Sequence, residues 1–118
     1  MPKLFHDRTQ PARCPFCGAN ILRPVEVEGG QWYDFAGGFC DCGAVFAFDP
    51  TARNGGAVFL QALIMATNGD MDLSLNLSEG EDYDAAYVRN YNPEINRVEP
   101  SSFGTLYFIR LRARVQDG

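Results

Sequence analysis

Residues 105–115 show the clearest alternation of apolar and polar positions in the chain. One face of this segment is wholly apolar and consists of Tyr107, Ile109, Leu111, Ala113 and Val115. The other face begins apolar and ends basic, with Leu106, Phe108, Arg110, Arg112 and Arg114. A period of two residues is typical of a β-strand, so we predict a strand over Thr105–Val115 with one apolar face and one mixed face.

A second pattern occupies the centre of the chain. Residues Ala57–Asn68 are almost entirely apolar, and only Gln61, Thr67 and Asn68 interrupt the run. This composition favours a helix, and Gly69 stands where a left-handed C-terminal cap is expected. The segment is shorter than the roughly 20 residues that a membrane span needs. We therefore predict a helix that is either a central core element or a subunit contact.

The remaining segments predict shorter elements. The β-prone stretches, with a reversal at Gly29-Gly30 after the first, are Ile21–Glu28, Gln31–Phe39 and Ala44–Phe48. Asp49 is expected to cap a short helical turn that begins at Pro50. Residues 85–91 and 96–99 are expected to pair as a hairpin around residues 92–94. Residues 70–78 alternate as a strand would, but their Asp, Ser and Asn content favours a short helix, and residues 79–84 form an acidic loop.

All four cysteines lie in two tight pairs, Cys14 with Cys17 and Cys40 with Cys42, and a glycine follows each pair. Thiolates this close on a turn can point at a common centre, as tetrahedral zinc requires with each sulfur at about 2.3 Å. Disulfides, iron in place of zinc, and cysteines that simply pack are the competing interpretations. Four protein ligands would leave no open position on the metal, so such a site would be structural and not catalytic.

The Cys-Pro-Phe-Cys-Gly turn resembles the knuckles of the zinc-ribbon (rubredoxin-like knuckle) superfamily, over roughly residues 12–48. The resemblance implies a structural zinc ion bound by Cys14, Cys17, Cys40 and Cys42. The second pair departs from the family pattern because a single residue separates its cysteines. The expected fold is α+β, with an N-terminal zinc-ribbon β unit, a central apolar helix and a C-terminal antiparallel β segment. We expect one domain over residues 1–118, with subregions 12–48 and 49–118.

Charge narrows the range of partners. The 10 basic and 15 acidic residues give a net charge of −5, and a zinc ion held by four thiolates would bring it to about −7. This balance disfavours broad binding to nucleic-acid phosphates. The local exceptions are the N-terminal residues Lys3, Arg8, Arg13 and Arg23 and the strand face of Arg110, Arg112 and Arg114. That face could hold an anion or a partner, but the acids at 79–84 favour pairing within the protein.

These observations predict a small soluble protein of the reducing cytoplasm, without a secretory leader or a contact with membranes. The expected function is a protein-interaction module, by self-association or with another protein, with the apolar helix as its candidate surface. A nucleic-acid-binding ribbon that uses the basic residues is the alternative. No catalytic residue is assigned, because His6 is the sole histidine and a Ser-His-Asp triad is hard to assemble. An enzyme would need a pocket of polar residues such as Arg53, Asn54, Tyr83, Tyr87, Arg89 and Arg97.

Overall fold

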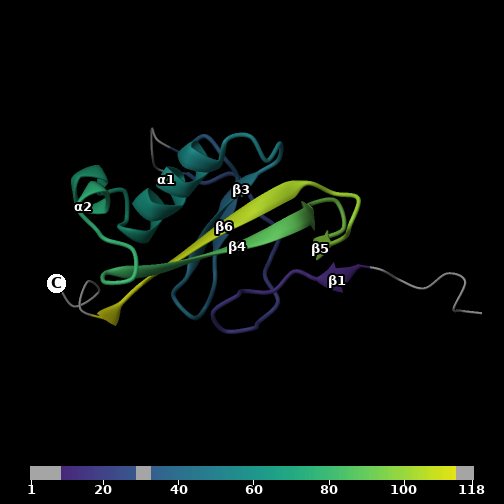
Figure 1. Ribbon diagram of the computed structural model, residues 1–118, viewed down its shortest axis with the longest axis horizontal. Helices are drawn as coiled ribbons and strands as arrows, with labels where there is room; N and C mark the ends of the chain where they lie inside the picture. Colours follow the sequence, from purple (N-terminus) through teal and green to yellow (C-terminus); the bar gives the residue numbers. More distant parts are fainter. Residues whose placement is uncertain (1–8, 29–32, 114–118) are drawn as a thin grey trace, which may run out of the picture.

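The computed structural model describes residues 9–28 and 33–113, which form an antiparallel sheet and two helices (Figure 1). The strands are β1 (Gln10–Pro11), β2 (Gly37–Phe39), β3 (Val45–Asp49), β4 (Tyr83–Asn92), β5 (Arg97–Val98) and β6 (Gly104–Leu111). The helices are α1 (Gly55–Ala66) and α2 (Met71–Leu75). The six strands lie in the order β1-β5-β4-β6-β3-β2. The described part of the chain is therefore α+β, as predicted.

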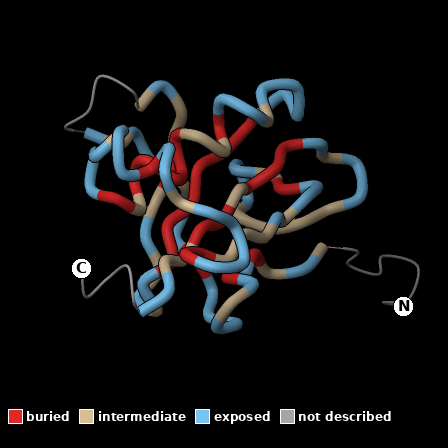
Figure 2. Tube along the Cα trace, turned by 60° about the vertical axis from the view of Figure 1, so that its left-hand side comes forward, coloured by how far each residue is buried: buried red, intermediate tan, exposed pale blue. Residues whose placement is uncertain are grey.

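The sheet is covered on both faces. On one face α1 packs over the apolar side of β3 and β6, where Val45, Ala47 and Ile109 are buried with Leu63 of the helix. On the other face lie the cysteine loops, by which we mean residues 12–22 and 40–44; they cover Phe46, Phe48, Leu106 and Phe108. Figure 2 shows the buried segments gathered in the middle of the molecule, with exposed segments around them. The two faces of the predicted strand Thr105–Val115 are confirmed in β6, because Tyr107 and Ile109 face α1 while Leu106 and Phe108 face the cysteine loops. The predicted end of this strand is wrong, since β6 ends at Leu111; residues 114–115 fall outside the described residues.

The apolar helix is a core element. Within α1 only Gly56 and Ala57 are exposed, and Val58 and Ala62 are fully buried against the sheet. Of the two predicted alternatives, α1 is therefore the core element. The prediction that its apolar side chains form an interaction surface is wrong, since most of them pack against the sheet. The predicted cap is confirmed: Gly69 has φ +87° and its N–H donates to the carbonyl of Ile64 at 2.9 Å.

The predicted short helix over residues 70–78 is confirmed as α2. Asp70 provides the N-cap, and its side chain accepts a hydrogen bond from the backbone N–H of Leu73 at 2.9 Å. The predicted hairpin is confirmed as β4 and β5, where Tyr91 pairs with Val98. β4 begins at Tyr83, so the acidic loop ends before that residue and not at Asp84.

Two predicted strands in the N-terminal half are wrong. Residues 21–28 contribute a single bridge, between Val25 and Gly37, and Pro24 beside it has no N–H to donate to a ladder. Of the predicted strand Gln31–Phe39, residues 31–32 fall outside the described part of the chain, and within residues 33–39 only Gly37–Phe39 forms a strand, β2. The reversal at Gly29-Gly30 falls outside the described residues. The predicted strand 44–48 is confirmed as β3, which pairs with β2 on one side and β6 on the other. The two predicted subregions, residues 12–48 and 49–118, thus contribute strands to the same sheet.

Asp49 organises the connection from β3 to α1. Its buried carboxylate accepts hydrogen bonds from the backbone N–H groups of Thr51 and Ala52 at 3.1 Å and of Asn54 at 2.8 Å, and from the Thr51 hydroxyl. The predicted helical turn at Pro50 is wrong, because residues 50–52 form bends and residues 53–54 are irregular; the Asp49 side chain binds the backbone of this loop instead of capping a helix. A neighbouring buried group, Gln61 of α1, is hydrogen bonded to both the N–H and the carbonyl of Phe35.

Neither helix within residues 9–28 and 33–113 has the length and apolar character needed to cross a membrane.

Candidate metal centre

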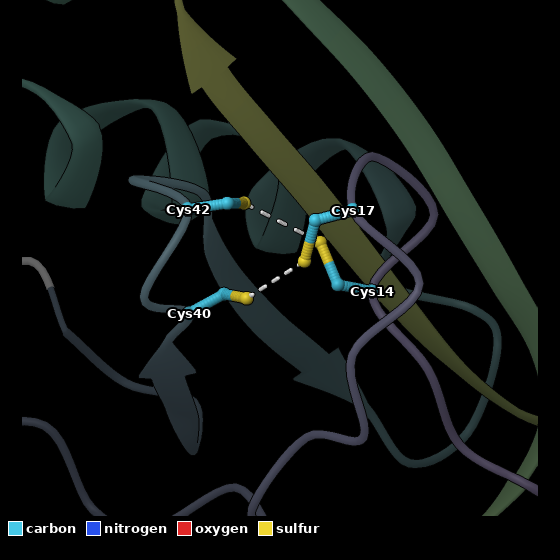
Figure 3. Close-up of side chains that lie close together, drawn as sticks. All are labelled: Cys14, Cys17, Cys40 and Cys42. Carbon is cyan, nitrogen blue, oxygen red and sulfur yellow. Dashed lines mark hydrogen bonds between the residues drawn. The ribbon is translucent and has the colours of Figure 1, made fainter.

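Two tight turns carry the cysteines toward one another on the face of the sheet opposite α1 (Figure 3). In the first turn the N–H of Gly18 donates to the carbonyl of Cys14 at 2.8 Å, and in the second the N–H of Gly43 donates to the carbonyl of Cys40 at 2.9 Å. Gly18 has φ +80° and Gly43 has φ +99°. A side chain at either glycine would meet no atom within 4 Å, so these positions favour glycine because of φ and not for lack of space.

The four sulfur atoms form one compact group. The Sγ atoms of Cys14 and Cys42 are 3.7 Å apart, those of Cys17 and Cys40 are 3.5 Å apart, and all four lie within 4.8 Å of one another. Tetrahedral zinc with bonds of about 2.3 Å would place its sulfurs about 3.8 Å apart. A disulfide requires about 2.05 Å, and all four cysteines are free thiols. The predicted cluster is thus confirmed, and its geometry fits a four-sulfur metal site.

The surroundings of the cysteines differ. Cys14 is buried, Cys17 is exposed, and Cys40 and Cys42 lie between these extremes. Burial raises the pKa of Cys14 to about 12. At Cys42 burial acts in the same direction, but hydrogen bonds from the Ala44 amide, the neighbouring thiols and Arg110 outweigh it and lower the pKa to about 7. A metal ion that binds here would therefore have to displace the proton of Cys14.

Arg110 lies beside this cluster. Its guanidinium carbon is 5.1 Å from the ring centroid of Phe16, a cation–π contact with the first cysteine turn, and it also interacts with Cys42. A metal ion held by four thiolates carries a net negative charge, which a neighbouring guanidinium stabilises. Arg110 is therefore placed to support the metal centre.

The other arginines of the predicted basic face do not join Arg110 in a common site. Arg112 donates to the carboxylate of Asp84 at 2.8 Å, which is the internal pairing expected from the acids at 79–84. Arg114 falls outside the described residues. Arg110 and Arg112 thus have separate partners within the protein.

Replacing Arg112 with Gln should raise the pKa of Asp84 toward its ordinary value. The hydrogen bond from Arg112 holds the Asp84 pKa down in the folded protein. The pair therefore stabilises the fold above the ordinary aspartate pKa, and this contribution is lost as the pH falls through the lowered value. An NMR titration of the Asp84 carboxyl group in both proteins measures the shift, and identical titrations would contradict the pairing. Because both side chains are substantially exposed, we expect little change in thermal stability at neutral pH.

The N-terminal basic residues do not form a described patch. Arg23 donates to the carbonyls of Pro93 and Glu94, both at 2.9 Å, and so ties the first cysteine loop to the β4–β5 turn. Arg13 is exposed. Lys3, Arg8 and the lone histidine, His6, lie outside the described residues.

A groove lies elsewhere on the molecule, on the α1-facing side of β4 and β6. It has a volume of about 560 Å³ and is lined by Ala52, Tyr87, Arg89, Asn90, Phe103, Thr105 and Tyr107. It brings together Tyr87 and Arg89 of the pocket residues expected for an enzyme, and Arg53 lines an adjoining hollow that shares Phe103. Tyr83 instead packs against Phe59. No sequence pattern pointed to Phe103 or Tyr107 as site residues, since only the pairing of β4 with β6 and the turn before β6 bring them to this groove.

Arg97, another expected pocket residue, donates from its Nε atom to the Thr9 hydroxyl and lies away from the groove. Asn54 belongs to the loop held by Asp49.

Comparisons with protein-family models, with curated proteins and with solved structures found no match to this chain. The fold and site define an α+β domain with a four-cysteine cluster that is compatible with a zinc-ribbon-like metal centre.

Proposed function

We propose that this protein is a zinc-ribbon-like interaction module of the reducing cytoplasm, in which Cys14, Cys17, Cys40 and Cys42 hold one structural zinc ion. The observation that carries the proposal is the grouping of all four sulfur atoms within 4.8 Å. Thiolate sets of this kind suit zinc and iron, and the free thiols fit a compartment that keeps cysteines reduced. Zinc is the proposed ion because it favours closed tetrahedral sulfur sites without redox chemistry.

The role proposed for the metal is mechanical. The first cysteine turn follows β1 at one edge of the sheet, and the second joins β2 to β3 at the other edge, so a shared ion would link the N-terminal segment to the β2–β3 connection. The four thiolates would fill every position of a tetrahedral ion and leave none for a substrate. The ion would therefore hold the cysteine loops over Phe46 and Phe108 and would keep that side of the core dry.

The surface proposed for a protein partner is the edge of the sheet at β2. Phe39 is 65% exposed and Val25 is 63% exposed. These side chains lie next to the second cysteine turn and at the last strand of the sheet. The Val25–Gly37 bridge already uses both outer hydrogen-bonding groups of Gly37, so a partner would bind here through the exposed side chains of Phe39 and Val25 and not by adding a strand at Gly37. We propose that zinc holds this edge in the conformation that the partner binds.

Metal analysis of the purified full-length protein tests the first part of the proposal. We expect one equivalent of zinc per chain. A purified protein that holds iron instead, or that binds no metal after incubation with zinc, would contradict it.

A photo-crosslinking residue at position 39 tests the second part. We expect discrete adducts with a partner protein in cells, and fewer adducts when Cys17 is also replaced by Ala. The same crosslinker at Ile95, which is 43% exposed at a distant turn, is the matched control. Equal labelling from positions 39 and 95 would exclude β2 as the interface. A mass that doubles with concentration, with the position 39 adduct formed between copies of the chain, would identify the partner as a second copy.

The nucleic-acid alternative loses support at the residues first expected to carry it. Arg112 and Arg23 have partners within the protein, and Arg110 lies against Phe16 and Cys42.

A further inference from the structure

The groove on the α1-facing side of the sheet is built by the pairing of β4 with β6. Tyr87 lies opposite Tyr107, and Arg89 lies opposite Thr105, on the part of the sheet just beyond the first turn of α1. Gly55 at that turn approaches Tyr107 so closely that a Cβ atom there would lie 2.7 Å from the tyrosine hydroxyl. Because α1 begins at Gly55, next to Tyr107, it does not extend over the part of the sheet beyond this residue. The resulting volume of about 560 Å³ falls in the range of small-molecule sites, roughly 300–1,000 Å³.

Aromatic rings dominate the walls of this groove. Tyr87 and Tyr107 meet edge to face with their ring centroids 5.2 Å apart. Phe103 is 69% exposed and Tyr87 is 52% exposed. Large aromatic side chains left open to solvent around a hollow offer π faces on which a planar ring can stack.

The charge of the groove contrasts with that of the chain. Acidic residues outnumber basic ones by 15 to 10 in the whole sequence. The groove and the two hollows that meet it at Phe103 are nevertheless lined by no acidic residue, and they contain Arg89 and Arg53. Neither guanidinium makes an ion pair among the described residues. The Asp49 carboxylate beside this corner is buried and accepts four hydrogen bonds from the adjoining loop. Two cations without an ion-pair partner in residues 9–28 and 33–113 therefore face this corner of an acidic protein.

The backbone around the groove is irregular. Ala52 has φ +60° and Asn90 has φ +59°, both in the left-handed region that non-glycine residues seldom adopt. The pairing of β4 with β6 shifts register between Arg89 and Tyr91, as at a β-bulge. Bulges and left-handed non-glycine residues cost energy and are common beside ligand sites, where they redirect side chains.

We propose that this groove binds a nucleotide unit, with the planar base stacked between Phe103 and the tyrosine pair and the phosphate held by Arg89 and Arg53. A planar ring with an attached anion matches both the aromatic side chains and the arginines of the lining, whereas a plain hydrocarbon matches only the first and a simple anion only the second. Because the groove is open, binding is weak and depends strongly on salt. This site is separate from the cysteine cluster and from the β2 edge, so the proposal stands independently of the proposed protein partner.

The test uses the zinc-loaded full-length protein and amide NMR shifts as the readout. Adenosine monophosphate should shift the signals of residues 87–90 and 103–107 at lower concentration than either adenosine or inorganic phosphate alone. The absence of shifts at these residues with adenosine monophosphate at millimolar concentration would overturn the proposal. Equal affinity for phosphate with and without the base would overturn it as well.

Matched variants separate the site from general surface effects. Phe103→Ala should weaken adenosine monophosphate about tenfold, whereas Phe39→Ala, which removes an equally exposed phenylalanine elsewhere, should leave the affinity unchanged. Arg89→Gln should weaken binding about tenfold and reduce its salt dependence, whereas Arg13→Gln in the cysteine loops should do neither. Equal losses within either pair would contradict the assignment of the groove.

A short single-stranded oligonucleotide distinguishes the two sources of this chemistry. Tighter binding of the oligonucleotide than of the mononucleotide, abolished by Phe103→Ala, would identify single-stranded nucleic acid as the source. Equal binding per site would identify the free nucleotide.

Discussion

Cys17→Ala should remove the metal ion and lower the free energy of unfolding at neutral pH by about 4 kcal/mol or more. Losses of this size are exceptional for a single substitution, and removal of a structural metal is one of the mechanisms that produces them. Cys17 is exposed, so its side chain contributes little to the core. Almost all of the loss should therefore come from the lost metal ligand. Denaturant unfolding of the zinc-loaded protein and of the variant, followed by circular dichroism, measures it.

The same experiment in excess chelator is the internal control. Without metal the two proteins should unfold within about 0.5 kcal/mol of each other, because an exposed side chain has little further effect. The zinc-loaded protein should also unfold in one transition, since the cysteine loops cover Phe46 and Phe108 at the centre of the sheet. A variant that keeps both zinc and wild-type stability would contradict the assignment of Cys17 as a ligand.

Asp49→Ala should lower the free energy of unfolding by about 2–4 kcal/mol. The buried carboxylate accepts four hydrogen bonds from residues 51–54, so its removal leaves several backbone donors without an acceptor. The relief of one buried charge offsets part of this cost. Hydrogen exchange should locate the damage in the loop and in the first turn of α1, and thermal unfolding should give its size.

Asp49→Asn is the matched control for this prediction. Asn keeps the volume and one acceptor oxygen, but it presents an amide N–H₂ group where the carboxylate accepts a second set of bonds. An intermediate loss of stability is therefore expected, together with weaker binding in the groove that Ala52 lines. Full stability in Asp49→Ala would show that water replaces the carboxylate in this loop.

Local sequence patterns predicted the elements whose burial is simple. Residues 57–68 are apolar on nearly every side, and six of the twelve residues of α1 are buried while only two are exposed. Residues 105–111 alternate, and β6 has a different layer on each face. The prediction failed for residues 21–28, where Pro24 and the cysteine loops replace strand pairing by a single bridge. There the path of the chain depends on the cysteine turns and on contacts with distant residues, such as Arg23 with Pro93.

The two sites differed in how far they could be predicted. The cysteine cluster was predictable because the short spacing within each turn already brings two sulfur atoms together. The fold then has only to bring the two turns into contact. The groove was not, because Ala52, Tyr87 and Phe103 come from three separate segments and carry no shared motif. The basic face could not be interpreted from the sequence for the same reason. The strand pattern groups Arg110 with Arg112, but only the fold brings Phe16 to Arg110 and forms the ion pair of Arg112 with Asp84.

By itself, the sequence of this protein determined the two cysteine turns, the apolar helix and the two faces of the long C-terminal strand, since these follow from residue type and from periods of a few residues. Only the tertiary structure decided the strand order, the position of the cysteine loops opposite α1, and the groove at the β4–β6 pair. Those features depend on which distant segments pair and pack, and that choice is made by burial summed over the whole sheet, which no local pattern records.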